Sequence, residues 1–147
     1  MSRIAFQRAF QELDDGELDD LIASAERFTF PAGTRILREG EDNARIFVVL
    51  EGAIRVVHFE REGAEKKIAD PLGPGDAFGE MSFIDEMGAS ATLIADSDVV
   101  AKAAGKDLVA ALAARHPGFM ERFYLSLLYT VIRRLRRLDA AFLMRGK

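Results

Sequence analysis

The chain has 147 residues, of which 49% are hydrophobic, and a formal net charge of −4. This length suits one compact domain and is too short for two domains of ordinary size. The absence of cysteine excludes disulfides, iron–sulfur clusters held by thiolates, cysteine-ligated haem and thiol redox sensing. Because no apolar run could span a bilayer and no signal-peptide pattern is present, we expect a cytoplasmic protein with no membrane partner.

Charged residues are concentrated at the two ends of the chain. The arginines near the end are Arg133, Arg134, Arg136 and Arg137, and the carboxylates near the start are Glu12, Asp14, Asp15, Glu17, Asp19 and Asp20. Such a distribution fits two arrangements, in which the two ends meet or each faces solvent.

Residues 5–26 are expected to form two short helices, because their apolar residues recur at helical spacing. These residues are Phe6, Phe10, Leu13, Leu18, Leu21, Ile22 and Ala25. Asp14 or Asp15 is the expected N-cap of the second helix.

Residues 27–105 have a different pattern, with short runs rich in β-formers separated by glycines. The runs are RFTF, TRIL, RIFVVL, AIRVVHFE, KKIADPL, SATLIA and DVVAKAA. The turn signals lie at Gly33, Gly40, Gly52, Gly63, Gly73 and Gly75. Many short strands with regular turn signals predict a β-barrel or sandwich.

From residue 106 onward the pattern is helical again. One helix is predicted over residues 106–115, a break at His116-Pro117-Gly118, and one long helix over residues 119–144. The long helix has an apolar stripe at coiled-coil spacing, formed by Leu128, Val131, Leu135, Leu138 and Phe142. Either the whole apolar face packs on the barrel, or the first half packs there and this stripe forms a homodimer interface.

Several segments together resemble a known family. PAGTRILREGEDNARIFVVLEGAIRV, GPGDAFGEMSF, ASATLIA and a C-terminal helix containing RRLRRL resemble the cyclic nucleotide-binding domain of bacterial catabolite-activator-type regulators and of kinase regulatory subunits. The resemblance covers about residues 10–138. It implies one domain over residues 1–147, mainly β with flanking α: N-terminal helices at 5–26, a β-roll or jelly-roll at 27–105, and C-terminal helices at 106–147. It also implies a phosphate-binding cassette at 75–92 and a long helix that shifts when ligand binds.

The cassette sequence suits an anion on physical grounds as well. Glycine at position 79 lets the backbone approach a ligand closely, and a short helix from Glu80 would point its free N–H groups at a phosphate. The resemblance implies that Glu80 accepts a hydrogen bond from a ribose 2′-hydroxyl, that Gly79 and Met81 line the sugar-phosphate, and that Ser90 and the Ala91 amide contact phosphate oxygens. Alternatively, Glu80 only complements the helix dipole, and Ser82 is only a helix-turn residue.

The chain departs from the family pattern at Ala89, where the resemblance implies an arginine that pairs with the phosphate. Losing one partner of a buried charged pair costs about 2–5 kcal/mol, and about 1.4 kcal/mol is tenfold in affinity. A micromolar cyclic nucleotide site would move toward the millimolar range. Because Asp85 and Glu86 make the cassette acidic, a neutral nucleoside-like or a cationic ligand is expected to fit better than a cyclic phosphate.

An arginine of the long helix is a candidate to replace the missing charge. In some relatives such an arginine approaches the pocket glutamate, and the RRL match would bring Arg134, or else Arg133, near Glu80. The alternative is an exposed arginine. The same match would bring Leu138 and Asp139 close to the purine position. The candidate ligand-binding residues are thus Phe78, Gly79, Glu80, Met81, Ser82, Ala89, Ser90, Ala91 and Arg134.

Other functional classes find no support in the sequence. His58 and His116 have no further ligand at metal spacing, and no catalytic motif is present, so we expect no metal site, no required cofactor and no enzyme. After Leu138 too few residues follow for a helix-turn-helix, so we expect no sequence-specific DNA binding. Two hypotheses remain: a regulatory sensor of a cyclic nucleotide or nucleoside-like molecule that signals through its C-terminal helix, or a ligand-free dimerisation module with a degenerate pocket.

Overall fold

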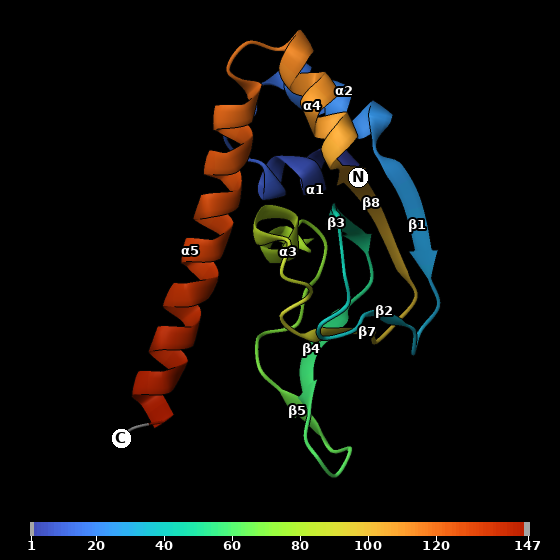
Figure 1. Ribbon diagram of the computed structural model, residues 1–147, viewed down its shortest axis with the longest axis vertical. Helices are drawn as coiled ribbons and strands as arrows, with labels where there is room; N and C mark the ends of the chain where they lie inside the picture. The colour runs from blue at the N-terminus through green and yellow to red at the C-terminus, as the bar shows by residue number, and fades with distance from the viewer. Residues whose placement is uncertain (1, 146–147) are drawn as a thin grey trace.

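The computed structural model describes residues 2–145 as two antiparallel sheets with helices at both ends (Figure 1). The helices are α1 (Ser2–Ala9), α2 (Asp15–Ser24), α3 (Glu80–Asp85), α4 (Lys106–Arg115) and α5 (Phe119–Arg145). The strands are β1 (Glu26–Phe30), β2 (Arg35–Leu37), β3 (Arg45–Glu51), β4 (Ile54–Phe59), β5 (Glu65–Lys67), β6 (Ala77–Phe78), β7 (Thr92–Ala95) and β8 (Val99–Gly105). The predicted mainly-β roll with flanking helices is confirmed.

The two sheets have the strand orders β1-β8-β3-β6 and β2-β7-β4-β5. Strand β3 lies inside the first sheet and is covered on both faces. Ile46 and Val48 belong to the hydrophobic cluster under the helices, whereas Phe47 and Val49 belong to the cluster between the sheets. A strand covered on both faces needs apolar side chains at successive positions, which explains the unbroken run in this segment.

The acidic N-terminal segment is held to the C-terminal helices by a partly buried ion pair. Asp14 caps α2 by accepting a hydrogen bond from the Glu17 amide at 2.8 Å, and Glu17 accepts one from the Asp14 amide at 2.9 Å. The Glu17 carboxylate is fully buried and also accepts two hydrogen bonds from Arg122 of α5, at 2.9 and 2.5 Å. These bonds lower the pKa of Glu17. The acidic segment therefore meets the start of α5, rather than the arginines that follow residue 132.

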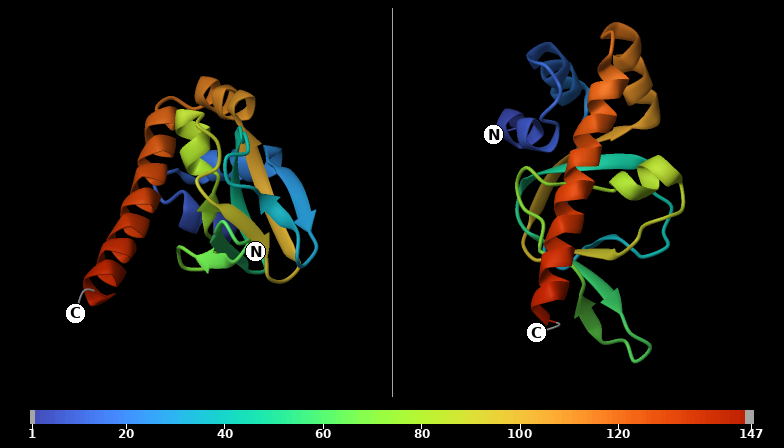
Figure 2. Two further views of the ribbon diagram at one scale, coloured as in Figure 1. Left: turned by 60° about the horizontal axis from the view of Figure 1, so that its bottom comes forward. Right: turned by 90° about the vertical axis from the view of Figure 1, so that its left-hand side faces the viewer.

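Helix α5 buries apolar side chains in the hydrophobic core only along its first half. Phe119, Phe123 and Leu127 are fully buried in the cluster under the helices. The second half of the helix runs on beside the roll, as both views in Figure 2 show. Of the predicted dimer stripe, Val131 is half-buried, and the other members are exposed: Leu128, Leu135, Leu138 and Phe142. The stripe is thus not covered within one copy of the chain.

Two strands, β5 and β6, differ from the sequence prediction. The run KKIADPL forms a strand only through Lys67, and Leu72 makes an isolated bridge to Ile54. Pro71 has no N–H to donate, which disfavours a continuous ladder across this segment. The two-residue strand β6 was not predicted, since it is too short to show a period of two.

Among the helices of residues 2–145, none combines the length and hydropathy needed to cross a bilayer.

Candidate functional site

A cavity of about 540 Å³ lies between α3, the second sheet and α5. Every candidate ligand-binding residue borders it: Phe78, Gly79, Glu80, Met81, Ser82, Ala89, Ser90, Ala91 and Arg134. Much of the remaining lining is apolar, including Leu37, Val56, Ile68, Leu72, Leu93 and Leu138. The structure therefore brings together residues from the cassette and from a helix more than forty residues further along the chain.

The backbone at the start of α3 is shaped by Gly79, whose φ is 83°. A Cβ at this position would lie 2.5 Å from the Asn43 side-chain nitrogen and 2.6 Å from the Arg45 carbonyl oxygen, so no other residue fits without a shift. Ser82 is buried, and its hydroxyl donates to the Asn43 carbonyl at 3.1 Å. The Ser82 hydroxyl thus anchors α3 to the segment before β3, which favours the structural interpretation of this residue.

Glu80 and Arg134 form the charged centre of the cavity. The carboxylate of Glu80 accepts a hydrogen bond from Arg134, whose guanidinium also donates to the Ala77 carbonyl. The Glu80 side chain is 8% exposed and that of Arg134 is 27% exposed. Arg133 points elsewhere and donates to the Thr130 hydroxyl at 3.4 Å. Of the two arginines considered, Arg134 therefore lies inward beside Glu80, and Arg133 is outside this cavity.

Ala89 and Ser90 border the cavity and contribute no charge to it. Ala89 is half-buried, and its backbone is fixed by a hydrogen bond from its amide to Glu41 at 2.9 Å and one from the Gly40 amide at 2.8 Å. Ser90 is exposed, and its hydroxyl lies 3.5 Å from the Met81 sulfur. Ala89 and Ser90 thus contribute a methyl group and a hydroxyl where the resemblance implies phosphate contacts.

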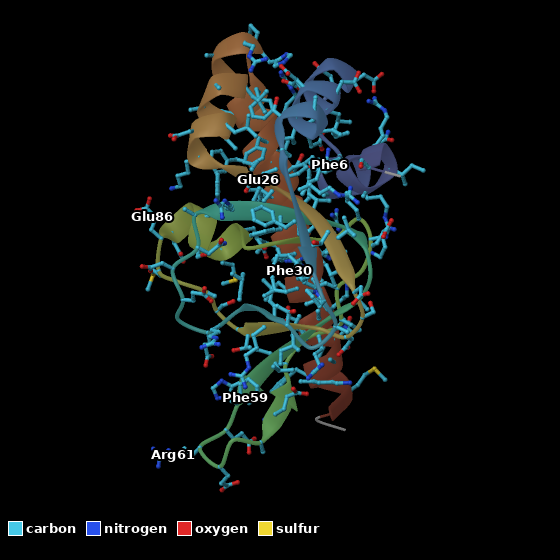
Figure 3. The ribbon with its side chains drawn as sticks, turned by 90° about the vertical axis from the view of Figure 1, so that its right-hand side faces the viewer. Phe6, Glu26, Phe30, Phe59, Arg61 and Glu86 are labelled. Atoms are coloured by element: carbon cyan, nitrogen blue, oxygen red, sulfur yellow. The ribbon has the colours of Figure 1, made fainter. Side chains whose placement is uncertain are left out.

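The expectation of an acidic pocket was wrong. Asp85 and Glu86 do not line the cavity: Asp85 accepts a hydrogen bond from the Met87 amide at 3.0 Å, and Glu86 pairs with Lys106 at 2.9 Å. Figure 3 shows Glu86 at the outer edge of the molecule, and the hydrogen bond from Lys106 lowers its pKa. The charged residues that do line the cavity balance one another: Lys67, Arg134 and Arg137 against Asp70, Asp76 and Glu80. The lining therefore does not favour a cation over an anion.

Neither histidine borders this cavity. His58 is 3.1 Å from Glu39 on the surface, and His116 caps α4 and pairs with Asp20 at 2.9 Å. This hydrogen bond lowers the pKa of Asp20. Within the part of the chain that the structure describes, no group of three or more His, Cys, Asp or Glu residues could hold a metal ion.

Some lining residues escaped the sequence analysis. Lys67 borders the cavity at the end of β5, Asp70 and Pro71 border it from the segment between β5 and β6, and Arg137 borders it from α5. The sequence pattern predicted one strand over KKIADPL, whereas Pro71 lies in a loop, as a proline favours. Leu138 borders the cavity, as the family match suggested, whereas Asp139 does not.

Comparisons with known proteins agree with this architecture. A model of the cyclic nucleotide-binding domain family matches residues 27–116. The chain is 32% identical over 108 residues to the cyclic AMP receptor protein of Thermus thermophilus, a match that covers 74% of this chain and 50% of that protein. The chain spans about half the length of the curated relatives it matches.

Solved structures of the same fold include one from Methylobacillus flagellatus, described as a cyclic nucleotide-binding domain, with a TM-score of 0.83 and 21% identity over 98% of this chain and 85% of that one. The catabolite activator protein of Thermus thermophilus has a TM-score of 0.77 and 28% identity over 95% of this chain and 63% of its own. The family match covers more than half of the chain, and the cavity lies where the cassette and the long helix meet. The chain belongs to the cyclic nucleotide-binding domain family.

Proposed function

We propose that this chain is a non-enzymatic regulatory sensor whose cavity binds a nucleotide-like small molecule and whose α5 transmits the occupancy to a partner. The observation that carries the proposal is the cavity of about 540 Å³ between the cassette and α5. This volume lies within the range of about 300–1,000 Å³ that is usual for small-molecule sites. The family membership supports the same conclusion.

The interior side chains leave this cavity unfilled. Phe83, which follows the cassette glycine, is buried in the cluster under the helices and packs edge-on against Phe123. Met81 borders the cavity but is 49% exposed. A lining that is mostly apolar in area but also carries charged and hydroxyl groups suits a nucleoside-like ligand, whose base has apolar faces and whose sugar has hydroxyls.

The proposed binding mode differs from that of a domain with an arginine at position 89. An anionic group in this cavity would be met by Arg134 from α5, and Arg134 already pairs with Glu80. A ligand that recruits either group must break that ion pair. We therefore expect the binding free energy of cyclic phosphates to be about 2–5 kcal/mol less favourable than in a site that has the arginine.

Helix α5 is suited to transmit occupancy because two features meet on it. Arg134 and Leu138 border the cavity, while Leu138 also belongs to the exposed apolar stripe with Leu135 and Phe142. We propose that this stripe forms a homodimer, since a second copy would cover the apolar side chains that one copy leaves in water. A change in the position of α5 on ligand binding would then alter the dimer.

The second candidate function is a dimerisation module that binds no ligand. Its supporting observation is that Glu80 and Arg134 satisfy each other without a ligand. The two candidates differ in whether any nucleotide-like molecule binds saturably to the cavity.

The experiment is calorimetric titration of the natural chain with cyclic AMP, cyclic GMP, AMP and adenosine, beside Ala89→Arg. A matched control is Met87→Arg, which adds the same charge at a position that is 82% exposed and outside the cavity. We expect little binding of cyclic AMP at about 0.1 mM to the natural chain, and binding at least about tenfold tighter to Ala89→Arg. Met87→Arg should behave like the natural chain.

The outcomes separate the two candidates. Saturable binding of any of these molecules, lost on Gly79→Arg, supports the sensor. Micromolar binding of cyclic AMP by the natural chain would refute the altered mode. No binding by the natural chain or by Ala89→Arg would favour the ligand-free module.

A further inference from the structure

A second, smaller cavity of about 110 Å³ lies on the other side of Arg134. It is bounded by α1, by the segment that leads into β6, and by α5; Figure 2 shows α1 beside the upper half of α5. Its side-chain lining is almost entirely polar: Arg8, Gln11, Asp76, Thr130, Arg133, Arg134 and Arg137. This composition is opposite to that of the larger cavity, which has an apolar lining.

Four guanidinium groups border this small space, and their charge is only partly compensated. Arg134 pairs with Glu80, and Arg137 is 3.9 Å from Asp70. Neither Arg8 nor Arg133 makes an ion pair with any residue that the structure describes. Because like charges repel, a concave group of cations is stabilised when an anion occupies it.

The two uncompensated arginines are exposed, and each makes one hydrogen bond to a neighbouring group. The stem of Arg8 lies against Gly75, where a Cβ would be 3.0 Å from Arg8 Cδ, and Gly75 has a φ of 90°. Arg8 also donates to the Pro74 carbonyl at 3.2 Å. Arg133 donates to the hydroxyl of Thr130, which is 7% exposed. Each of these guanidinium groups thus uses one N–H to hold its position and keeps others for a ligand.

Asp76 is the one carboxylate among the described residues of this lining, and it is already engaged. Its Oδ2 accepts a hydrogen bond from the Gly73 amide at 2.8 Å, which shapes the turn before β6. The lining therefore carries a net positive charge even when the whole negative charge of Asp76 is included.

We propose that this cavity binds a small phosphate-type oxyanion, either inorganic phosphate or the terminal group of a phosphomonoester. Several guanidinium groups around one centre match a tetrahedral oxyanion, which accepts hydrogen bonds in many directions. The volume suits one such group, and the scarcity of apolar lining disfavours a larger organic ligand. The site shares Asp76, Arg134 and Arg137 with the larger cavity, but its proposed ligand needs no nucleotide in that cavity in order to bind.

Arg134 connects this oxyanion site to the larger cavity. It borders both spaces, together with Asp76 and Arg137, and its guanidinium is shared between Glu80 and the Ala77 carbonyl. An anion in the small cavity attracts Arg134 away from Glu80. Occupation of the oxyanion site therefore frees the Glu80 carboxylate in the larger cavity.

The test is calorimetric titration of the full chain with inorganic phosphate and with methyl phosphate, in about 0.15 M sodium chloride so that exposed charges are screened. No nucleotide is present, so the result is independent of the proposed sensor function. We expect saturable binding, weakened at least about tenfold in Arg8→Gln and in Arg133→Gln, because each variant removes charged donors from the oxyanion.

The matched control is Arg136→Gln, an arginine of the same exposed stretch of α5 that borders neither cavity. It removes the same charge from the chain and should leave phosphate binding unchanged. Urea denaturation of each variant checks folding, and Arg133→Gln, on the exposed surface of a helix, keeps the test valid if Arg8→Gln is unstable. Absence of saturable binding, equal binding by Arg133→Gln, or equal weakening by Arg136→Gln would overturn the proposal. A preference for methyl phosphate over inorganic phosphate would identify a phosphomonoester as the bound form.

Discussion

The ion pair between Glu80 and Arg134 links the cassette to α5, and its removal tests that link directly. Arg134→Gln leaves the Glu80 carboxylate without its cationic partner and the Ala77 carbonyl without its donor. The glutamine side chain is shorter and uncharged, so it cannot replace both hydrogen bonds. We expect a loss of stability and a more mobile second half of α5.

The size of this loss follows from the burial of the two groups. Breaking a fully buried ion pair by removing one partner costs about 3–5 kcal/mol. Here the Glu80 side chain is 8% exposed and borders a cavity of about 540 Å³ that admits water. Solvation of the carboxylate offsets part of the cost, so we expect a decrease of about 1–3 kcal/mol in the free energy of unfolding.

Urea denaturation measures this change. With a slope of about 2 kcal/mol per molar urea, the midpoint of Arg134→Gln should fall by about 0.5–1.5 M. In a double-mutant cycle, Glu80→Gln combined with Arg134→Gln should be less destabilised than the sum of the single variants. The control is Arg136→Gln, which borders neither cavity and should change the midpoint little. Additive effects, or a midpoint unchanged by Arg134→Gln, would show that the two residues do not stabilise the fold together.

Three further predictions follow from other contacts. The hydrogen bonds from Arg122 lower the pKa of Glu17 below its ordinary 4.5, so protonation of Glu17 favours the unfolded chain. The free energy of unfolding, measured by urea denaturation at several pH values, should therefore fall as the pH drops below about 4.5. This fall should be less steep in Glu17→Gln. Leu135→Asp should convert a dimer to a monomer in light scattering, because it places a charge in the apolar stripe. Gly79→Ala should lower the free energy of unfolding by more than about 1 kcal/mol, since φ is 83° and the added Cβ would lie 2.5 Å from the Asn43 side-chain nitrogen.

Each of these predictions has its own control. For the pH dependence, if the free energy of unfolding of Glu17→Gln falls at low pH as steeply as that of the natural chain, other carboxylates, such as Asp20, dominate acid unfolding. For the dimer, Ile84→Asp alters a residue of similar exposure on α3, outside the stripe, and should leave the mass unchanged. An unchanged mass in Leu135→Asp would remove the stripe as the interface. For the glycine, the control is Gly33→Ala, because Gly33 has a similar φ of 88° but open space around it. If Gly33→Ala and Gly79→Ala lower the free energy of unfolding equally, backbone strain alone explains the effect and the clash with Asn43 contributes nothing.

Local patterns in the sequence were sufficient to locate most of the fold. Helical spacing and the Pro-Gly break predicted α4 and α5 with boundaries within a residue of those observed. Glycine-bounded apolar runs predicted most of the strands, and Asp14 was one of the two expected caps of α2. These features depend on residues a few positions apart, because capping, turns and strand periodicity act over such distances.

The cassette residues could also be found from the sequence, since Gly79 and the first turn of α3 are neighbours. The chemistry of the site could not. Arg134 lies 54 residues from Glu80, and only the packing of α5 on the roll decides which arginine of the run turns inward. Asp85 and Glu86 are close to the pocket in sequence but lie on the outer end of α3, so sequence proximity predicted the wrong local charge.

The sequence by itself determined the kinds of elements, the family and the absence of an arginine at position 89. Tertiary structure alone decided what charge surrounds each cavity. Arg8 and Arg133 face one small space although α1 and α5 lie at opposite ends of the chain. The reason is physical: helix capping, turns and side-chain periodicity depend on residues close in sequence, whereas the electrostatic environment of a cavity sums charges from every segment that folding brings within a few ångströms.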